Sequence, residues 1–301
     1  MSIEPLSYDI TSIRVADWIV SLADGGQHAG NTIAAYLSGI STWWESRVAG
    51  AAITPANPTS VVWVRRVLQG IKNELARVDQ VHRQQRYVEP LLMATVSRIQ
   101  RQFNLEVRAD LTIFAAAALG VAALLRPNAL LGTNTYQDRG VRAEHLTFFT
   151  ATMSPMPRDS PDTPDHFSLF VPIDKTDQGR TGHTRIIAAT TAVSAIWRLW
   201  RISPPTGPLF TQISGSPLRG GSLIRKLKEA LRKEGYAHFE SFSAKSFRRG
   251  GASTLAEAGV QGNDLAQAGA WAAGSHVPNR YIGAAQHRQR AVEISRMMER
   301  A

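Results

Sequence analysis

The sequence predicts a mainly helical protein with a small β-sheet, an α+β fold, divided into a helical domain at 1–84 and a mixed domain at 85–301. Apolar residues recur at helical spacing before residue 84, residues 111–125 form one apolar run, and two alternating segments flank a polar turn. With 301 residues, of which 44% are apolar, the chain can bury a full core.

Three helices are expected in the first domain, because apolar side chains recur there with a period close to 3.6. They run from Thr11 to about Ala23, from about Ala29 to Val48 and from about Ser60 to Ala76. Segments rich in glycine or proline separate them, and these residues favour turns.

A basic segment, residues 77–90, follows the third helix and ends at a proline, which is typical of a linker. It is either a solvated tether or a strap along DNA phosphates, in which case Arg83 and Arg86 are candidate DNA contacts. The chain carries a formal net charge of +10 and a pI of about 10.4, so its expected partner is a polyanion. Double-stranded DNA is the leading candidate, and no lysine-rich tail indicates a membrane surface.

The second domain is expected to begin with two helices, one from Pro90 to about Phe103 and one from about Ala109 to Leu125. The second helix ends at Arg126, because the following proline biases this residue away from helical geometry. Residues 134–151 alternate and are predicted as a strand pair. Residues 153–165 contain four prolines and are predicted as an exposed loop.

Two further strands, 167–173 and 184–188, are predicted from apolar, β-branched runs, with a polar hairpin tip at 174–183 between them. A basic amphipathic pattern predicts a helix at 221–234. The remaining helices are expected at 190–200, after Lys245 and at 286–300.

Several classes of protein are excluded by what the sequence lacks. Cysteine is absent, and the eight histidines are scattered without a His-x3-His pair, so neither disulfides nor a metal site are expected. No phosphate-binding Gly-x4-Gly-Lys-Ser/Thr loop occurs, and no cofactor is predicted. The start of the chain does not resemble a signal peptide, and the longest apolar run is too short for a membrane span. We therefore expect an intracellular protein, nuclear if eukaryotic and otherwise cytoplasmic.

One stretch suggests chemistry: Lys245-Ser-Phe-Arg-Arg-Gly-Gly251, followed by Trp271 and then by Tyr281. Cations close to a phenol suit a tyrosine that attacks a phosphodiester, because guanidinium groups hold the phosphate and stabilise its developing charge. The tyrosine then carries the phosphoryl group covalently.

These motifs occur in the order seen in tyrosine recombinases of the phage-integrase family, which the chain resembles from about residue 86 to its end. The first part, with Thr32-Ile-Ala-Ala-Tyr-Leu-Ser-Gly-Ile40, resembles that family's core-binding domain. The phrase Ser-Phe-Arg-Arg-Gly-Gly-Ala is most similar to recombinases of eukaryotic mobile elements. The resemblance implies a clamp around DNA, a 3′-phosphotyrosyl intermediate and a tetramer on two DNA sites.

The resemblance also implies roles for single residues. Arg126 and Arg248 would grip the phosphate, Lys175 on the hairpin would protonate the leaving 5′ oxygen, and Trp271 would donate its indole N–H or only pack. Lys245 stands where the family usually has histidine. The implied catalytic set is Arg126, Lys175, Lys245, Arg248, Trp271 and Tyr281. Candidate DNA contacts are Arg180, Arg185, Arg249, Arg83, Arg86 and Lys226.

One departure from the family pattern concerns Ala129, because an acidic residue that orients the first arginine usually stands there. A substitute carboxylate such as Asp174, slower catalysis or a decayed enzyme would each explain it. Ala129 and Lys245 leave open a non-catalytic DNA-binding relative as an alternative function. Two further alternatives are a type IB topoisomerase and, from another class, a metal-dependent transposase. The terminal helix packs either on its own domain or on a neighbouring protomer.

Overall fold

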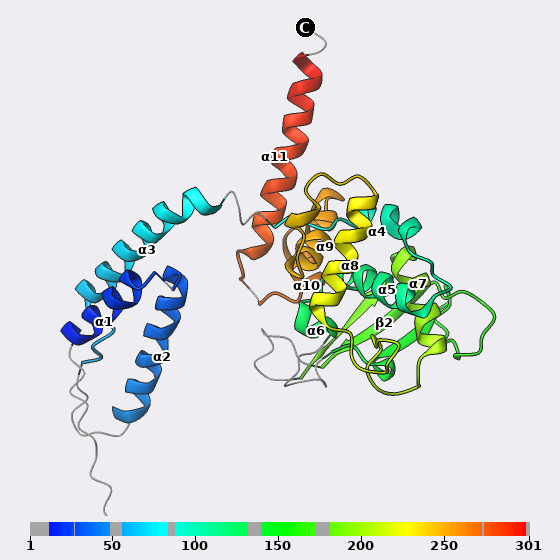
Figure 1. Ribbon diagram of the computed structural model, residues 1–301, viewed down its shortest axis with the longest axis horizontal. Coiled ribbons are helices and arrows are strands. Elements are labelled where there is room, and N and C mark those ends of the chain that lie inside the picture. The colour runs from blue at the N-terminus through cyan, green and yellow to red at the C-terminus, as the bar shows by residue number, and fades with distance from the viewer. Residues whose placement is uncertain are drawn as a thin grey trace, which may run out of the picture. The chain divides into compact units, whose positions relative to one another are not determined.

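The computed structural model describes residues 12–26, 28–48, 56–83, 88–131, 140–172, 181–272 and 274–298. Within these residues the protein is mainly helical with one three-stranded sheet, which confirms the predicted α+β class. Contacts divide the chain into two units, residues 1–87 and 88–301 (Figure 1). None of the helices in the described ranges is long and apolar enough to cross a membrane.

The described residues of the first unit form three helices, α1 (Ser12–Asp24), α2 (Gly30–Val48) and α3 (Val62–Arg83). The helical period of the sequence turns one apolar stripe of each helix inward, so that the three stripes meet in one core. The buried residues of this core are Val15, Ile19, Ile33, Leu37 and Val64.

Helix α3 is longer than the sequence pattern indicates, because it continues to Arg83 through part of the segment predicted as a linker. Residues 77–83 are mostly polar but contain neither glycine nor proline, and arginine and glutamine are good helix formers. Val78 and Val81 also continue the apolar spacing of three residues that follows Leu75, so the sequence contains no signal that ends the helix there.

The second unit is built around α5 (Arg108–Ala122), in which every residue from Leu111 to Val121 is buried. This helix is the apolar run seen in the sequence, and it is buried because other helices cover it on several sides. Among the helices that pack against it are α4 (Met93–Ile99), α7 (Thr190–Ile202), α8 (Gly220–Lys233) and α9 (Lys245–Glu257).

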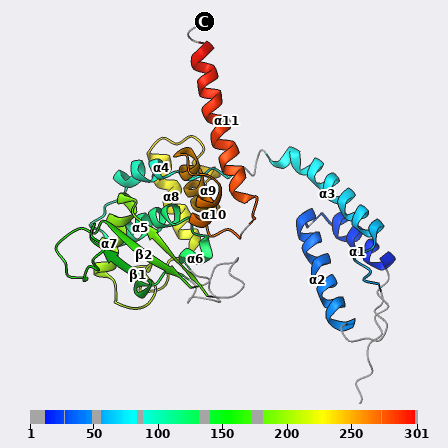
Figure 2. The same cartoon turned by 180° about the vertical axis from the view of Figure 1, so that it is seen from behind.

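The sheet consists of β1 (Leu146–Phe149), β2 (His166–Val171) and β3 (His183–Ile187), antiparallel in the order β1-β2-β3 (Figure 2). Its inner face carries Phe148 opposite Phe167, and both rings belong to the large core of this unit.

The strand pair predicted within residues 134–151 is not found in the described part of that segment. Only β1 is a strand there, and it pairs with β2. Just before it, Arg142 forms a bridge with Pro208, and the amide of Ala143 donates to the carbonyl oxygen of Gly207 at 2.9 Å. The local alternation was correct, but the pairing partners lie far along the chain.

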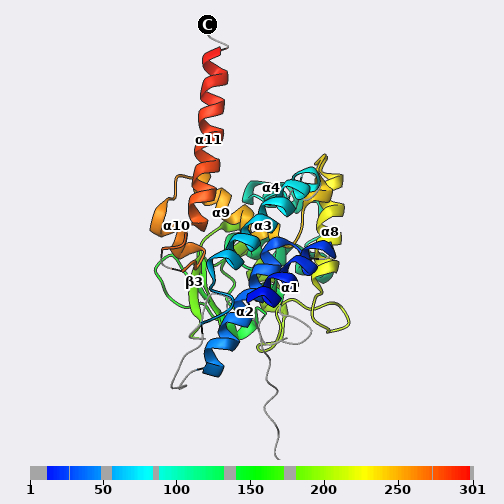
Figure 3. The same cartoon turned by 90° about the vertical axis from the view of Figure 1, so that its left-hand side faces the viewer.

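The described part of this unit also contains α6 (Pro127–Leu131), α10 (Gly262–Ala268) and α11 (Val277–Met298). Short 3₁₀ helices also occur at 100–102, 143–145 and 239–241. Helix α11 begins well before residue 286, where the sequence predicts its start. Pro278 does not prevent the earlier start, because it lies in the first turn of the helix, where a missing N–H breaks no helical hydrogen bond. Its distal half extends beyond the rest of the unit, whereas α10 lies beside β3 (Figure 3).

Candidate functional site

Arg126 lies in the turn between α5 and α6. Leu124, two residues before it, has a left-handed backbone with φ of 48°, which reverses the chain after α5. Pro127 then starts α6, and the carbonyl oxygen of Arg126 accepts hydrogen bonds from the amides of Ala129 and Leu130, both at 3.0 Å. The Arg126 side chain is half-buried, and this turn sets the point at which it leaves the backbone.

Arg248 lies one turn into α9 and connects two other parts of the site. Its guanidinium donates to the carbonyl oxygen of Leu124 at 2.9 Å and to that of Gly269 at 2.6 Å. It also lies 4.5 Å from the centre of the Trp271 ring. Arg248 therefore joins the turn that carries Arg126 to the segment that carries Trp271.

Two glycines allow α9 to come this close to its neighbours. A Cβ atom at Gly250 would lie 1.7 Å from the carbonyl oxygen of Leu91, and one at Gly251 would lie 2.2 Å from that of Val121. Both contacts are with backbone, which cannot turn aside as a side chain can. The two glycines therefore serve the close packing of α9.

Trp271 and Tyr281 face each other, with ring centres 5.9 Å apart and planes at 35°. Both rings pack on a small apolar cluster formed by Ala256, Leu265 and Ala285, which come from α9, α10 and α11. Ala270 is left-handed, with φ of 46°, and turns Trp271 back toward this cluster. The packing expected of Trp271 is thus present.

Arg248, Trp271 and Tyr281 form a continuous stack from α9 to α11, which we call the stack below. Lys245, the first residue of α9, is exposed and lies three residues before Arg248, so both side chains leave the same face of the helix. Lys175 and Arg180 lie outside the described residues, between β2 and β3.

Arg185 does not lie where a DNA-contacting side chain was expected. It is only 8% exposed, and its guanidinium donates to the carbonyl oxygen of Ala123 and to Nε2 of His183, the latter at 3.0 Å. The period of two along β3 could have shown this, because Arg185 shares a face with the buried Ile187.

The other candidate DNA contacts lie in varied places. Arg249 is exposed, and its guanidinium donates to the carbonyl oxygen of Val88 at 2.9 Å. Arg83 is the last residue of α3, and Arg86 lies outside the described residues. Lys226 is exposed on α8 and pairs with Glu229 at 3.2 Å.

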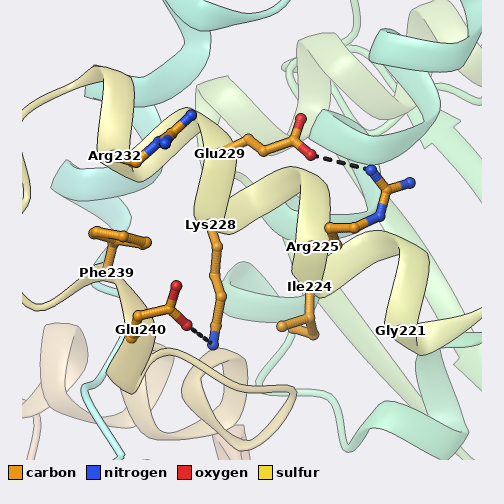
Figure 4. A pocket seen from close by; sticks show the side chains of 8 residues that line it. All are labelled: Gly221, Ile224, Arg225, Lys228, Glu229, Arg232, Phe239 and Glu240. Carbon is orange, nitrogen blue, oxygen red and sulfur yellow. Dashed lines mark hydrogen bonds and ion pairs between the residues drawn. The ribbon is translucent and has the colours of Figure 1, made fainter.

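The basic face of α8 borders an open pocket of about 540 Å³ (Figure 4). Lys228 pairs across it with Glu240 at 2.8 Å, and Arg225 pairs with Glu229 at 3.0 Å along the helix. Arg232 and Phe239 also line it. Since these ion pairs are solvated, they are weak and can exchange for phosphate.

Ala129 lies in α6 and is only 6% exposed, so no carboxylate stands at this position beside Arg126. Asp174, the possible substitute, lies outside the described residues.

No protein-family model matches the sequence, and no curated protein is significantly similar to it. Solved structures are similar. The integrase of the Tn1549 transposon, in complex with circular intermediate DNA, is 11% identical, with a TM-score of 0.53 over 91% of this chain and 81% of that one. The same integrase with transposon right end DNA is 13% identical, with a TM-score of 0.52 over 94% and 86%.

The XerH site-specific recombinase, bound to a palindromic difH substrate after cleavage, is also similar. It is 14% identical, with a TM-score of 0.55 over 97% of this chain and 73% of that one. The chain therefore has the tyrosine recombinase fold, as the sequence motifs indicate. The narrower resemblance to recombinases of eukaryotic elements stays a prediction.

Proposed function

We propose that this protein is a site-specific DNA recombinase that cleaves and rejoins DNA strands through Tyr281, without metal or ATP. The stack carries this proposal: a tyrosine packs on a tryptophan whose other neighbour is an arginine, and that arginine is bonded to the turn of Arg126. These residues come from separate elements and meet in a tyrosine recombinase fold.

In the proposed reaction, Oη of Tyr281 attacks the phosphorus atom, its proton passes to solvent, and the bond to the 5′ oxygen breaks. A 3′-phosphotyrosyl bond forms, and Lys175 gives a proton to the leaving oxygen, which becomes a 5′ hydroxyl. The 5′ hydroxyl of a partner strand then attacks the phosphotyrosine and releases the enzyme. One phosphodiester replaces another, so the reaction needs no external energy source.

Arg126 and Arg248 bind the two non-bridging oxygens, whose charge grows as the phosphorus becomes five-coordinate. A guanidinium carries five N–H donors, so Arg248 can bind backbone carbonyls and a phosphate together. Lys245 adds positive charge from the start of α9, and the indole N–H of Trp271 is a further donor.

DNA binding is supported by the net charge of +10 and by the basic face of α8. For the assembly we propose a homotetramer on two DNA sites, and the distal half of α11 supports it. This half extends beyond its own unit, and Met297 on it is 60% exposed. Because isolated short helices are marginal in water, a neighbouring protomer is the surface on which it packs.

The test is a covalent trapping assay. The protein and its Tyr281→Phe variant are incubated, with chelator present, with randomly nicked DNA from the flanks of the gene. Where a nick lies just beyond a cleavage site, the short fragment that carries the freed 5′ hydroxyl diffuses away and the adduct is trapped. We expect an adduct that survives denaturation for the unaltered protein and none for Tyr281→Phe, although both bind the DNA. Sequencing the adduct gives the site.

Other outcomes identify the rival interpretations. Salt-sensitive binding without any adduct indicates a non-catalytic DNA-binding protein. Relaxation of supercoiled plasmid by a monomer indicates a type IB topoisomerase. Activity that chelation abolishes indicates a metal-dependent transposase.

A further inference from the structure

The turn between α5 and α6 is bonded by two arginines at consecutive carbonyl groups. Arg185 from β3 donates to the oxygen of Ala123, and Arg248 from α9 donates to that of Leu124. These carbonyls lie at the C-terminal end of α5, where the helix dipole favours positive charge. The turn is therefore fixed from the sheet on one side and from α9 on the other.

Burial of the Arg185 guanidinium needs a physical reason, because a charge removed from water is costly unless it is paired. Arg185 is 8% exposed and lies in β3, opposite Leu169 of β2. The carbonyl of Ala123 and the ring of His183 compensate it. The Arg185 contact fixes the backbone at Ala123 and Leu124, which lie three and two residues before Arg126.

Ala129 adds to the importance of such a contact. The methyl group of Ala129 is buried in α6 and cannot orient Arg126 as a carboxylate would. The direction in which the Arg126 side chain leaves the backbone is set by the turn. Leu124 holds a left-handed conformation in this turn, which persists only where the surroundings determine it.

We infer that Arg185 is a positioning residue for Arg126, acting through the carbonyl of Ala123 rather than by touching DNA. This inference rests on the proposed function, because Arg126 must meet a phosphate for its position to matter. Since β3 follows the segment that contains Lys175, the same contact ties the turn of Arg126 to the strand beyond the proposed general acid.

A double-mutant cycle tests the inference on a nicked duplex with the sequence recovered from the adduct. We expect Arg185→Met to lower the single-turnover cleavage rate about 10- to 100-fold, because small displacements of a binding group have effects of this order. The dissociation constant for DNA should change less than about 2-fold. In an Arg126→Ala background, Arg185→Met should lower the cleavage rate by less than about a further 2-fold, because the effects of substitutions at two residues that act through one another are not additive.

Arg198→Met is the matched control. Arg198 also donates to a backbone carbonyl, that of Leu105 at 3.2 Å, but at the opposite end of α5. It should leave cleavage unchanged even if it lowers the melting temperature as much as Arg185→Met does. An equal loss from Arg185→Met in both backgrounds, or a loss matched by weaker DNA binding, overturns the inference.

Hydrogen exchange separates this inference from the proposed function, because it needs no DNA. The amides of Ala129 and Leu130 donate to the carbonyl oxygen of Arg126. They should exchange faster in Arg185→Met than in the unaltered protein, whereas Arg198→Met should leave their exchange rates unchanged. If the unaltered protein forms no adduct, the proposed function fails while this measurement still decides whether Arg185 holds the turn. Unchanged exchange there overturns the inference.

Discussion

Replacing Gly250 with alanine should destabilise the second unit strongly. The new Cβ would lie 1.7 Å from the carbonyl oxygen of Leu91, so the two backbones would have to separate by about 1.3 Å to reach 3.0 Å, below which real Cβ contacts hardly occur. The separation would also strain the bond from the amide of Leu91 to the carbonyl oxygen of Ser246, now 3.0 Å. Overpacking typically costs about 1–3 kcal/mol, and a contact between two backbones belongs at the upper end.

A cost of about 3 kcal/mol lowers the melting temperature of a unit of this size by about 6–12 °C. Calorimetry of Gly250→Ala measures this shift. Gly283→Ala is the control, since a Cβ atom at this position of α11 would meet nothing within 4 Å and alanine is the better helix former. Its melting temperature should not fall. If Gly250→Ala melts like the unaltered protein, α9 does not lie against Leu91 and the described site is wrong.

Three further outcomes are expected. Trp271→Phe keeps the ring packing but removes the indole N–H, so the melting temperature should hold while trapped cleavage falls about 100-fold, the effect of one lost donor. The pKa of Glu234 is lowered, chiefly by the hydrogen bond from Arg101. The stability that ionised Glu234 contributes is therefore fully present above the pKa that this carboxyl has in the unfolded chain, and it is lost as the pH falls through its pKa in the folded protein. The melting temperature of Glu234→Gln should therefore fall less steeply with acid than that of the unaltered protein. Arg158 stacks 4.3 Å from the centre of the Trp200 ring, so Arg158→Ala should speed proteolysis of the loop at 151–165.

The sequence was sufficient for features that depend on local periodicity or on motif order. The apolar run at 111–125 became the central helix α5, because a segment apolar on every side must be buried. The order of the motifs predicted that Arg248, Trp271 and Tyr281 lie in one site, and in the structure the three side chains form the stack. The roles of these residues in catalysis stay predictions.

Features that depend on distant pairing were not predictable. Arg142 bridges to Pro208, about 65 residues away, and no local pattern encodes such a partner. The inward side of Arg185 was encoded in the strand period but was hidden by its charge, because buried arginines are rare. The extension of α3 to Arg83 is not evident from the basic composition of residues 77–90, but the spacing of Leu75, Val78 and Val81 and the absence of glycine and proline are compatible with it.

Two of the left-handed non-glycine residues in the described part of the chain, Leu124 and Ala270, lie at the candidate site and set a limit on how stable this protein can become without losing the proposed activity. Non-glycine residues in this conformation cost about 1–2 kcal/mol each, and both lie beside carbonyl groups that Arg248 binds. Selection for thermostability alone would favour glycine at Ala270, which relieves the cost but loosens the segment before Trp271. Variants from such a selection should therefore gain melting temperature and lose catalytic rate together, a trade-off located at one residue.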